Sequence, residues 1–127
     1  MLSCEELAEQ VTDALDSGNL EAISHLLHPN ARWGAPDDDN PTCQNRNQVL
    51  NWARQATESG VRARVIEVAV SGDKILVGLK VAGRSALGEP NGDMDRWQVM
   101  TVVDGKIADI RGFEDRAEAA LRAGVGS

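Results

Sequence analysis

The segment from Arg96 to Leu121 constrains the fold of this chain more than any other part of it. The residues from Val99 to Val103 are rich in β-branched side chains, which are typical of strands. Asp104-Gly105 then supplies the two positive-φ positions that a two-residue hairpin turn needs. A second strand must therefore begin directly after this turn. Asp115 and Glu118 have the spacing of a helix N-terminal capping pair, and Gly124 can end that helix. The segment predicts an antiparallel hairpin followed by a short C-terminal helix.

The second strand of this hairpin has two chemically different faces, because successive side chains of a strand alternate. One face is expected to carry Ile107, Asp109, Arg111 and Phe113, and the other Ala108, Ile110 and Gly112. The first strand alternates in the same way, with Trp97, Val99 and Thr101 opposite to Gln98, Met100 and Val102. We expect the face with Gln98, Met100 and Ile110 to point inward.

Helical periodicity dominates the chain before residue 61. Capping residues precede each of the three helical stretches, at Ser3, Asn19 and Asn45. The stretches end at Gly18, at His28-Pro29 and at Gly60. A short strand is expected at Ala31–Gly34, and the proline-bounded acidic stretch Ala35–Thr42 is expected to be an exposed loop.

From Val61 the apolar period changes to two, which is typical of strands. Strands are expected at Val61–Val70 and Lys74–Gly83, with Asn91-Gly92 as a further hairpin turn before the opening segment. Helices first and an antiparallel meander afterwards predict an α+β domain, with the helices on one face of a curved sheet.

Length and charge exclude several classes of function. The chain has 127 residues, which fits a single domain spanning residues 1–127. Its net charge of −7 disfavours nucleic acid and anionic membrane surfaces as partners. The N-terminal residues do not form a signal peptide pattern and no apolar run is long enough to span a membrane, so a cytoplasmic location is expected.

Three short motifs in this order resemble the nuclear transport factor 2-like superfamily, in particular its SnoaL-like branch. They are Ala-Arg-Trp after His28-Pro29, Gln-Asn-Arg-Asn-Gln-Val at the start of the third helix, and Asp-Gly-Lys-Ile in the last hairpin. The resemblance implies a cystatin-like cone, in which a bent sheet wraps around the helices. It also implies a pocket between sheet and helices and, frequently, a homodimer through the outer face of the sheet. Function does not follow from this fold alone.

Catalytic sets of the resembled families are incomplete in this chain. Ketosteroid isomerase chemistry needs a tyrosine and two carboxyl groups, and this sequence contains no tyrosine. The resemblance places Val11, Ala35 and Gln98 at those three positions. The acid/base position of SnoaL-like cyclases falls on Gly112. Asp95, Arg96 and Asp109 supply the residue types of a limonene epoxide hydrolase site, although solvated charges at strand edges are the favoured interpretation.

Metal and thiol chemistry are not indicated either. Asp37, Asp38 and Asp39 are consecutive, whereas a calcium loop alternates its ligands. His25 and His28 could share a helical face, but the chain has no further histidine. A catalytic Cys43 would need one of these histidines as its base. We therefore expect no metal, no cofactor and reduced thiols.

The inner face predicts a binding site for a hydrophobic small molecule. The expected pocket is lined by Val11, Trp33, Trp52, Val77, Leu79, Gln98, Met100 and Ile110. The tryptophans could alternatively be ordinary core residues. The outer face predicts a homodimer interface made by Trp97, Val99, Thr101 and Phe113.

Two functions are consistent with this sequence. The first is a non-catalytic domain that binds an apolar metabolite, and the second is a SnoaL-like isomerase, cyclase or hydrolase acting on such a metabolite. A buried carboxylate pointing into the cone would favour the enzyme, because burial would raise the pKa of that group and suit it to act as a base.

Overall fold

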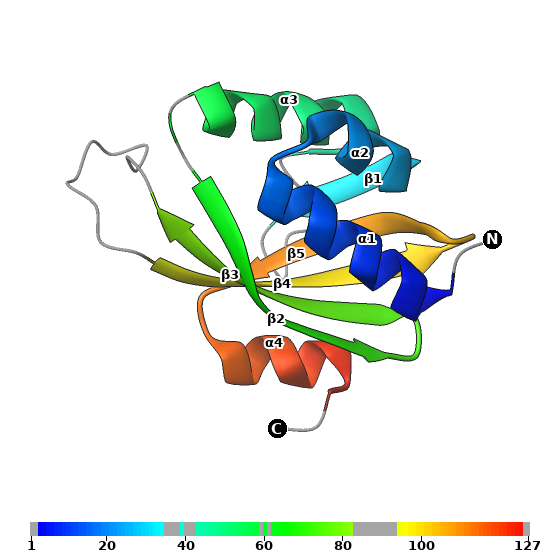
Figure 1. Cartoon of the computed structure of the whole chain (residues 1–127). Helices are drawn as coiled ribbons and strands as arrows, with labels where there is room; N and C mark the ends of the chain where they lie inside the picture. Colours follow the sequence, from blue (N-terminus) through cyan, green and yellow to red (C-terminus); the bar gives the residue numbers. More distant parts are fainter. Residues whose placement is uncertain are drawn as a thin grey trace.

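A curved sheet of five strands forms the centre of the molecule and carries helices on both faces (Figure 1). The structure, a computed structural model, describes residues 3–34, 39, 43–58, 60, 62–82 and 94–125. The strands are β1 (Leu27–Gly34), β2 (Arg62–Ser71), β3 (Lys74–Ala82), β4 (Met94–Val103) and β5 (Lys106–Phe113). They lie in the order β1-β5-β4-β3-β2. The pairs from β2 to β5 are antiparallel, whereas β1 runs parallel to β5.

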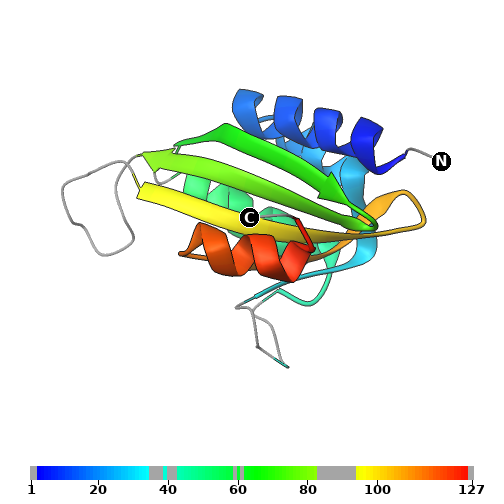
Figure 2. The same cartoon turned by 90° about the horizontal axis from the view of Figure 1, so that it is seen from below.

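The helices are α1 (Cys4–Ser17), α2 (Leu20–Leu26), α3 (Arg46–Glu58) and α4 (Arg116–Ala123). The first three lie over the inner face of the sheet, and α4 lies across the outer face (Figure 2). The predicted α+β class, with three N-terminal helices held by a curved sheet and a short C-terminal helix, is confirmed. Our expectation that helices would cover only one face is wrong, because α4 packs on the other.

Local capping chemistry explains where the helices begin and end. Ser3 Oγ accepts a hydrogen bond from the backbone N–H of Glu6 at 3.2 Å, and Glu6 Oε1 accepts one from the N–H of Ser3 at 3.3 Å. This reciprocal pair is the capping box that the sequence predicts for α1. Asp115 Oδ1 accepts from the N–H of Ala117 at 3.3 Å and opens α4. Gly124 ends α4 in the left-handed conformation, with φ at 75°.

The hairpin turn between β4 and β5 also forms as predicted. Asp104 and Gly105 both have positive φ, at 53° and 74°. The other predicted turn, Asn91-Gly92, and the acidic stretch Ala35–Thr42 fall largely outside the described residues. An irregularity in the β4–β5 register follows the turn, since Val102 pairs with Ile107 whereas Thr101 pairs with Asp109. This shift turns Ile107 into the inner core and corrects its expected outward position.

The strand after α2 is longer than expected and differently paired. α2 ends at Leu26, so Leu27 and His28 belong to β1 instead of the helix. The sequence predicts this strand only at Ala31–Gly34, within an antiparallel sheet. In the structure β1 runs parallel to β5 and lies at the edge of the sheet. Pro29 is tolerated there, because at an edge its missing N–H need not pair with a neighbour.

The inner core lies between the sheet and the first three helices. Its buried side chains are Leu7, Ala8, Val11, Ala14, Leu26, Leu27, Ala31, Cys43, Val49, Ile75, Val77, Leu79, Met100, Ile107 and Ile110. The other sheet edge, β2, is held to α1 by a polar contact. Asp16 Oδ1 accepts a hydrogen bond from the backbone N–H of Val65 at 2.7 Å, beside a register shift of β2.

A second core lies beneath α4 on the outer face. It contains Leu76, Trp97, Val99, Phe113, Ala119, Ala120 and Ala123. Trp97 is only 8% exposed, and its ring lies against the backbone of Gly78 so closely that a Cβ there would collide with it. Arg116 of α4 stacks over the Trp97 ring at 5.8 Å and pairs with Glu67 of β2, with Nε to Oε1 at 2.9 Å. The outer apolar patch that we expected to be exposed is therefore covered by this chain itself.

Candidate ligand-binding site

The inner face of the sheet changes from apolar to charged along β4. Met100 is buried and pairs with Ile110 of β5. Gln98 is partly exposed and pairs with Gly112 of β5. Arg96 is partly exposed and pairs with Leu79 of β3. These three β4 side chains share the inner face because they alternate with Trp97 and Val99, which belong to the outer core. An apolar floor, an amide and a cation thus follow one another toward one end of the sheet.

Gly112 leaves space on this face. Among the described residues, a Cβ built on Gly112 would meet no atom within 4 Å. Its partner across the ladder is Gln98, which in turn pairs with Val77 of β3. We call the space beside Gln98 and Gly112 the inner hollow. A Cβ added at Gly112 would therefore displace no described neighbour.

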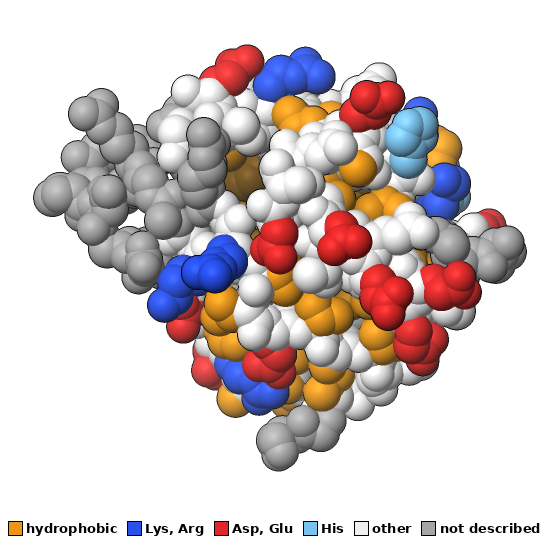
Figure 3. Space-filling model, in the orientation of Figure 1, with side chains coloured by type: hydrophobic (Ala, Val, Ile, Leu, Met, Phe, Trp, Pro, Cys, Tyr) orange, Lys and Arg blue, Asp and Glu red, His pale blue; other side chains and the backbone are white. Residues whose placement is uncertain are grey.

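The molecular surface is hollowed at the same end of the sheet. Figure 3 shows a depression between α3 and the beginning of β2, with hydrophobic side chains at its floor. Partly buried hydrophobic residues pack against the inner core in this region: Leu50 of α3, Ala63 and Val65 of β2, and Val81 of β3. Apolar contact is therefore available to a molecule that enters from this side.

Two tryptophans lie where α3 meets β1. Their ring centroids are 4.5 Å apart at an interplanar angle of 57°. Trp33 packs against the inner core, and its backbone exchanges hydrogen bonds with Cys43 at 2.9 and 3.0 Å. Trp52 is 48% exposed. Trp52 therefore covers Trp33 from the solvent side, which differs from the direct pocket lining expected of it.

The structure brings most of the expected pocket residues together. Val11, Val77, Leu79, Met100 and Ile110 belong to one buried cluster, with Trp33 packed against it. Gln98 shares their face of the sheet and is the polar member of the set. The four buried residues on the sheet form a packed floor, Val11 of α1 packs over it, and the space at Gly112 lies on the same face of the sheet. That these residues contact a ligand stays a prediction.

An ion pair stands at the rim of this inner face. Arg96 Nη1 lies 3.2 Å from Glu114 Oε1, and the two side chains are 43% and 86% exposed. Exposed pairs of this kind contribute little to stability, typically below about 1 kcal/mol. From the sequence, Arg96 is assigned only to a hydrolase-like set. Alternation alone also places Arg96 on the same face as Gln98, which follows it by two residues.

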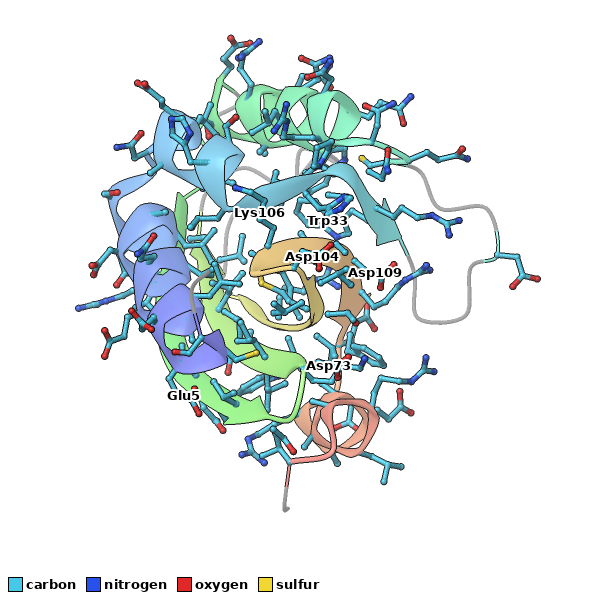
Figure 4. The ribbon with its side chains drawn as sticks, turned by 90° about the vertical axis from the view of Figure 1, so that its right-hand side faces the viewer. Glu5, Trp33, Asp73, Asp104, Lys106 and Asp109 are labelled. Carbon is cyan, nitrogen blue, oxygen red and sulfur yellow. The ribbon has the colours of Figure 1, made fainter. Side chains whose placement is uncertain are left out.

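The hydrolase-like set does not converge. Asp95 is exposed and lies on the opposite face of β4 from Arg96. Asp109 points away from the face that α1 covers (Figure 4) and is bound by Arg111, with Nε to Oδ2 at 3.0 Å. Arg96 lies on the inner face whereas Asp95 and Asp109 lie on the outer face, so the interpretation as solvated charges at strand edges is favoured over a catalytic constellation.

Histidine and metal chemistry are not assembled in the described part of the chain. His25 is exposed on α2, where its carbonyl oxygen accepts a hydrogen bond from Lys106 Nζ at 2.8 Å (Figure 4). His28 lies in β1, and its Nδ1 accepts from the N–H of Asn30 at 3.1 Å. Among the described residues, no group of three potential metal ligands is found. Asp37 and Asp38 lie outside them.

Cys43 is suited to a structural role. It is buried in the inner core, and burial raises the pKa of its thiol. A nucleophilic cysteine needs the opposite shift, because the thiolate is the reactive form. Within the described ranges, no polar or charged side chain is fully buried, so none of them provides a carboxylate enclosed in the cone.

The SnoaL-like domain family matches residues 8–110, which is most of the chain. This protein belongs to the SnoaL-like domain family. No curated protein matches it significantly. No helix of the described part of this SnoaL-like protein is both long and apolar enough to cross a membrane.

Solved structures agree with this family assignment. A candidate polyketide cyclase of Sinorhizobium meliloti is 26% identical, with 84% of this chain and 93% of that one covered at a TM-score of 0.67. An uncharacterised cystatin-fold protein of Novosphingobium aromaticivorans is 14% identical, with 89% and 99% covered at 0.75. A candidate ketosteroid isomerase of Kribbella flavida is 18% identical, with 87% and 76% covered at 0.69. The last two show likeness of fold alone.

Proposed function

We propose that this SnoaL-like protein binds a small, largely apolar molecule in the inner hollow and performs no acid–base chemistry on it. The observation that carries this proposal is the open space at Gly112 beside the Gln98 amide. The apolar floor of Val77, Leu79 and Met100 supplies hydrophobic contact, and a single amide can orient a ligand through hydrogen bonds. The names of the similar structures, a polyketide cyclase and a ketosteroid isomerase, favour a small-molecule ligand.

The residue at the open position argues against catalysis. The family resemblance implies that Gly112 stands where SnoaL-like cyclases carry an acid/base carboxylate, and that Gln98 stands where ketosteroid isomerases carry an acidic donor. An amide neither accepts nor releases a proton near neutral pH. A SnoaL-like enzyme is the alternative, and it would need an ionisable group from outside the described residues.

A larger side chain at position 112 tests whether the inner hollow binds the ligand. Gly112→Leu should abolish binding of naphthalenemethanol, measured by isothermal titration calorimetry, because the new side chain takes the space of the probe. The variant should still fold, which circular dichroism checks, since the first added atom, Cβ, meets no described atom within 4 Å. The control is Ala117→Leu, which places a leucine at an exposed position of α4 on the outer side of the sheet.

Two outcomes would overturn the proposal. One is a folded Gly112→Leu variant that binds the probe as tightly as wild type does. The other is a folded wild type that binds neither naphthalenemethanol nor naphthoate. A pH-dependent turnover of a bound ester or ketone, retained after both histidines are replaced, would instead favour the enzyme.

A homodimer and a cytoplasmic location stay predictions. The dimer was expected through Trp97, Val99, Thr101 and Phe113, three of which α4 buries within one chain. A second copy could use these three only if α4 moved away. Thr101 is partly exposed and stays available to such an interface.

A further inference from the structure

We infer that the ligand carries a carboxylate, which Arg96 binds at the rim of the inner hollow while the apolar body lies beside Gly112. This inference rests on the proposed function and adds the chemical class of the ligand. Arg96 shares the inner face with Gln98, two residues away on the same strand, and pairs across the ladder with Leu79 of the inner core. Cation, amide and apolar floor are therefore in line.

The present partner of Arg96 is easily replaced. Glu114 is 86% exposed, and one contact at 3.2 Å joins it to Arg96. An exposed carboxylate keeps most of its hydration, so the pair loses little when the carboxylate turns away. A ligand carboxylate held partly out of water by the hollow would interact more strongly, and guanidinium can bind it through two parallel hydrogen bonds.

The charge of the whole protein makes this position notable. The net charge is −7, so an anionic ligand is repelled by most of the surface. A cation placed beside the apolar hollow offsets that repulsion locally. An uncharged ligand would gain nothing from it.

A purely structural role is the competing explanation for Arg96. The ion pair could simply tether Glu114, which lies between β5 and α4, to β4. The two explanations differ in what they predict for Glu114→Gln. A tether would be weakened, whereas a ligand site would lose its internal competitor and bind an anion more tightly.

The experiment compares two probes of similar size and shape, naphthoate and naphthalenemethanol, by isothermal titration calorimetry. Wild type should bind naphthoate roughly tenfold more tightly, the effect expected of one charge-assisted contact that is partly exposed. Arg96→Met should remove this preference without weakening naphthalenemethanol. Arg64→Met is the matched control, because Arg64 is exposed and pairs with Lys80, on the outer face. It should keep the preference.

Glu114→Gln completes the test and does not depend on the folding of Arg96→Met. It should bind naphthoate more tightly than wild type and naphthalenemethanol equally well. A preference that survives in folded Arg96→Met, or a naphthoate affinity that falls in Glu114→Gln, would overturn the inference while leaving the proposed function intact. Failure of both probes on folded wild type would overturn both.

Discussion

Replacing Gly78 with alanine should destabilise this protein strongly, although it adds only one methyl group. The Trp97 ring lies over Gly78, and a Cβ there would come closer to ring carbons than side chains normally approach. Either the ring must move or the strands must separate. Such overpacking typically costs about 1–3 kcal/mol.

The structure also sets an upper bound on the effect. If Trp97 left its site completely, burial of roughly 200 Å² would be lost, which is about 5 kcal/mol at 25 cal/mol per Å². Partial displacement of the ring costs less free energy than complete loss, because Trp97 keeps most of its contacts between the sheet and α4. We therefore expect a loss of about 3 kcal/mol, which lowers the melting temperature by roughly 10 °C in a domain of this size.

Thermal and urea unfolding, followed by circular dichroism, measure this change. Gly112→Ala is the matched control, since it adds the same group to the next strand but one, on the opposite face. Its Cβ meets no described atom within 4 Å, and its φ is not in the left-handed region. It should be neutral or stabilising by up to about 1 kcal/mol. Equal stability of Gly78→Ala and wild type would refute the packing described for Trp97.

Three further predictions concern other residues. The hydrogen bond from Arg116 holds the pKa of the Glu67 carboxyl below its usual 4.5. The stability advantage of wild type over Glu67→Gln should therefore be constant above about pH 5.5 and shrink as the pH falls through the lowered pKa, and an advantage that grows in acid would contradict this. In Cys4→Ser, the buried Cys43 thiol should react with a disulfide reagent far more slowly than in urea, because burial raises its pKa; equal rates would contradict its burial. If a homodimer forms through the outer face, Thr101→Arg should convert it to a monomer in light scattering while the melting temperature is kept, whereas a wild type that is already monomeric would refute the dimer.

Alternation along each strand could be predicted from sequence, and it groups Gln98 with Met100 on β4 and Ile110 with Gly112 on β5. The pairing between the two strands depends on more than the turn, because continuing the pairs Val103–Lys106 and Val102–Ile107 without a break would place Gln98 opposite Arg111. A shift of one residue between Thr101 and Val102 instead places Met100 opposite Ile110 and Gln98 opposite Gly112, and it leaves Ile107 on the inner face. Such a shift depends on how the sheet bends as a whole, and no local residue pattern announces it.

The position of α4 could not be predicted in the same way. The spacing of Ala119, Ala120 and Ala123 indicates a helix with one apolar side, but not which surface that side will meet. The outer patch around Trp97 offered two possible partners, a second copy of the chain or its own C-terminal helix. An intramolecular partner has the advantage of its high effective concentration. The space at Gly112 could not be predicted from sequence either, because it depends on how the neighbouring residues are arranged in the fold.

The hydrogen bond from Val65 to Asp16 also bears on how this protein avoids aggregation. β2 is an edge strand, and a free edge can template the addition of a strand from another molecule. At Val65 the edge donor is already occupied by a carboxylate from α1, and the adjacent shift in register breaks the regular spacing of the groups beside it. A strand from another molecule could not accept a hydrogen bond from the N–H of Val65, and the Asp16 carboxylate would lie between it and the edge of β2. One side chain of a helix thus limits the growth of the sheet.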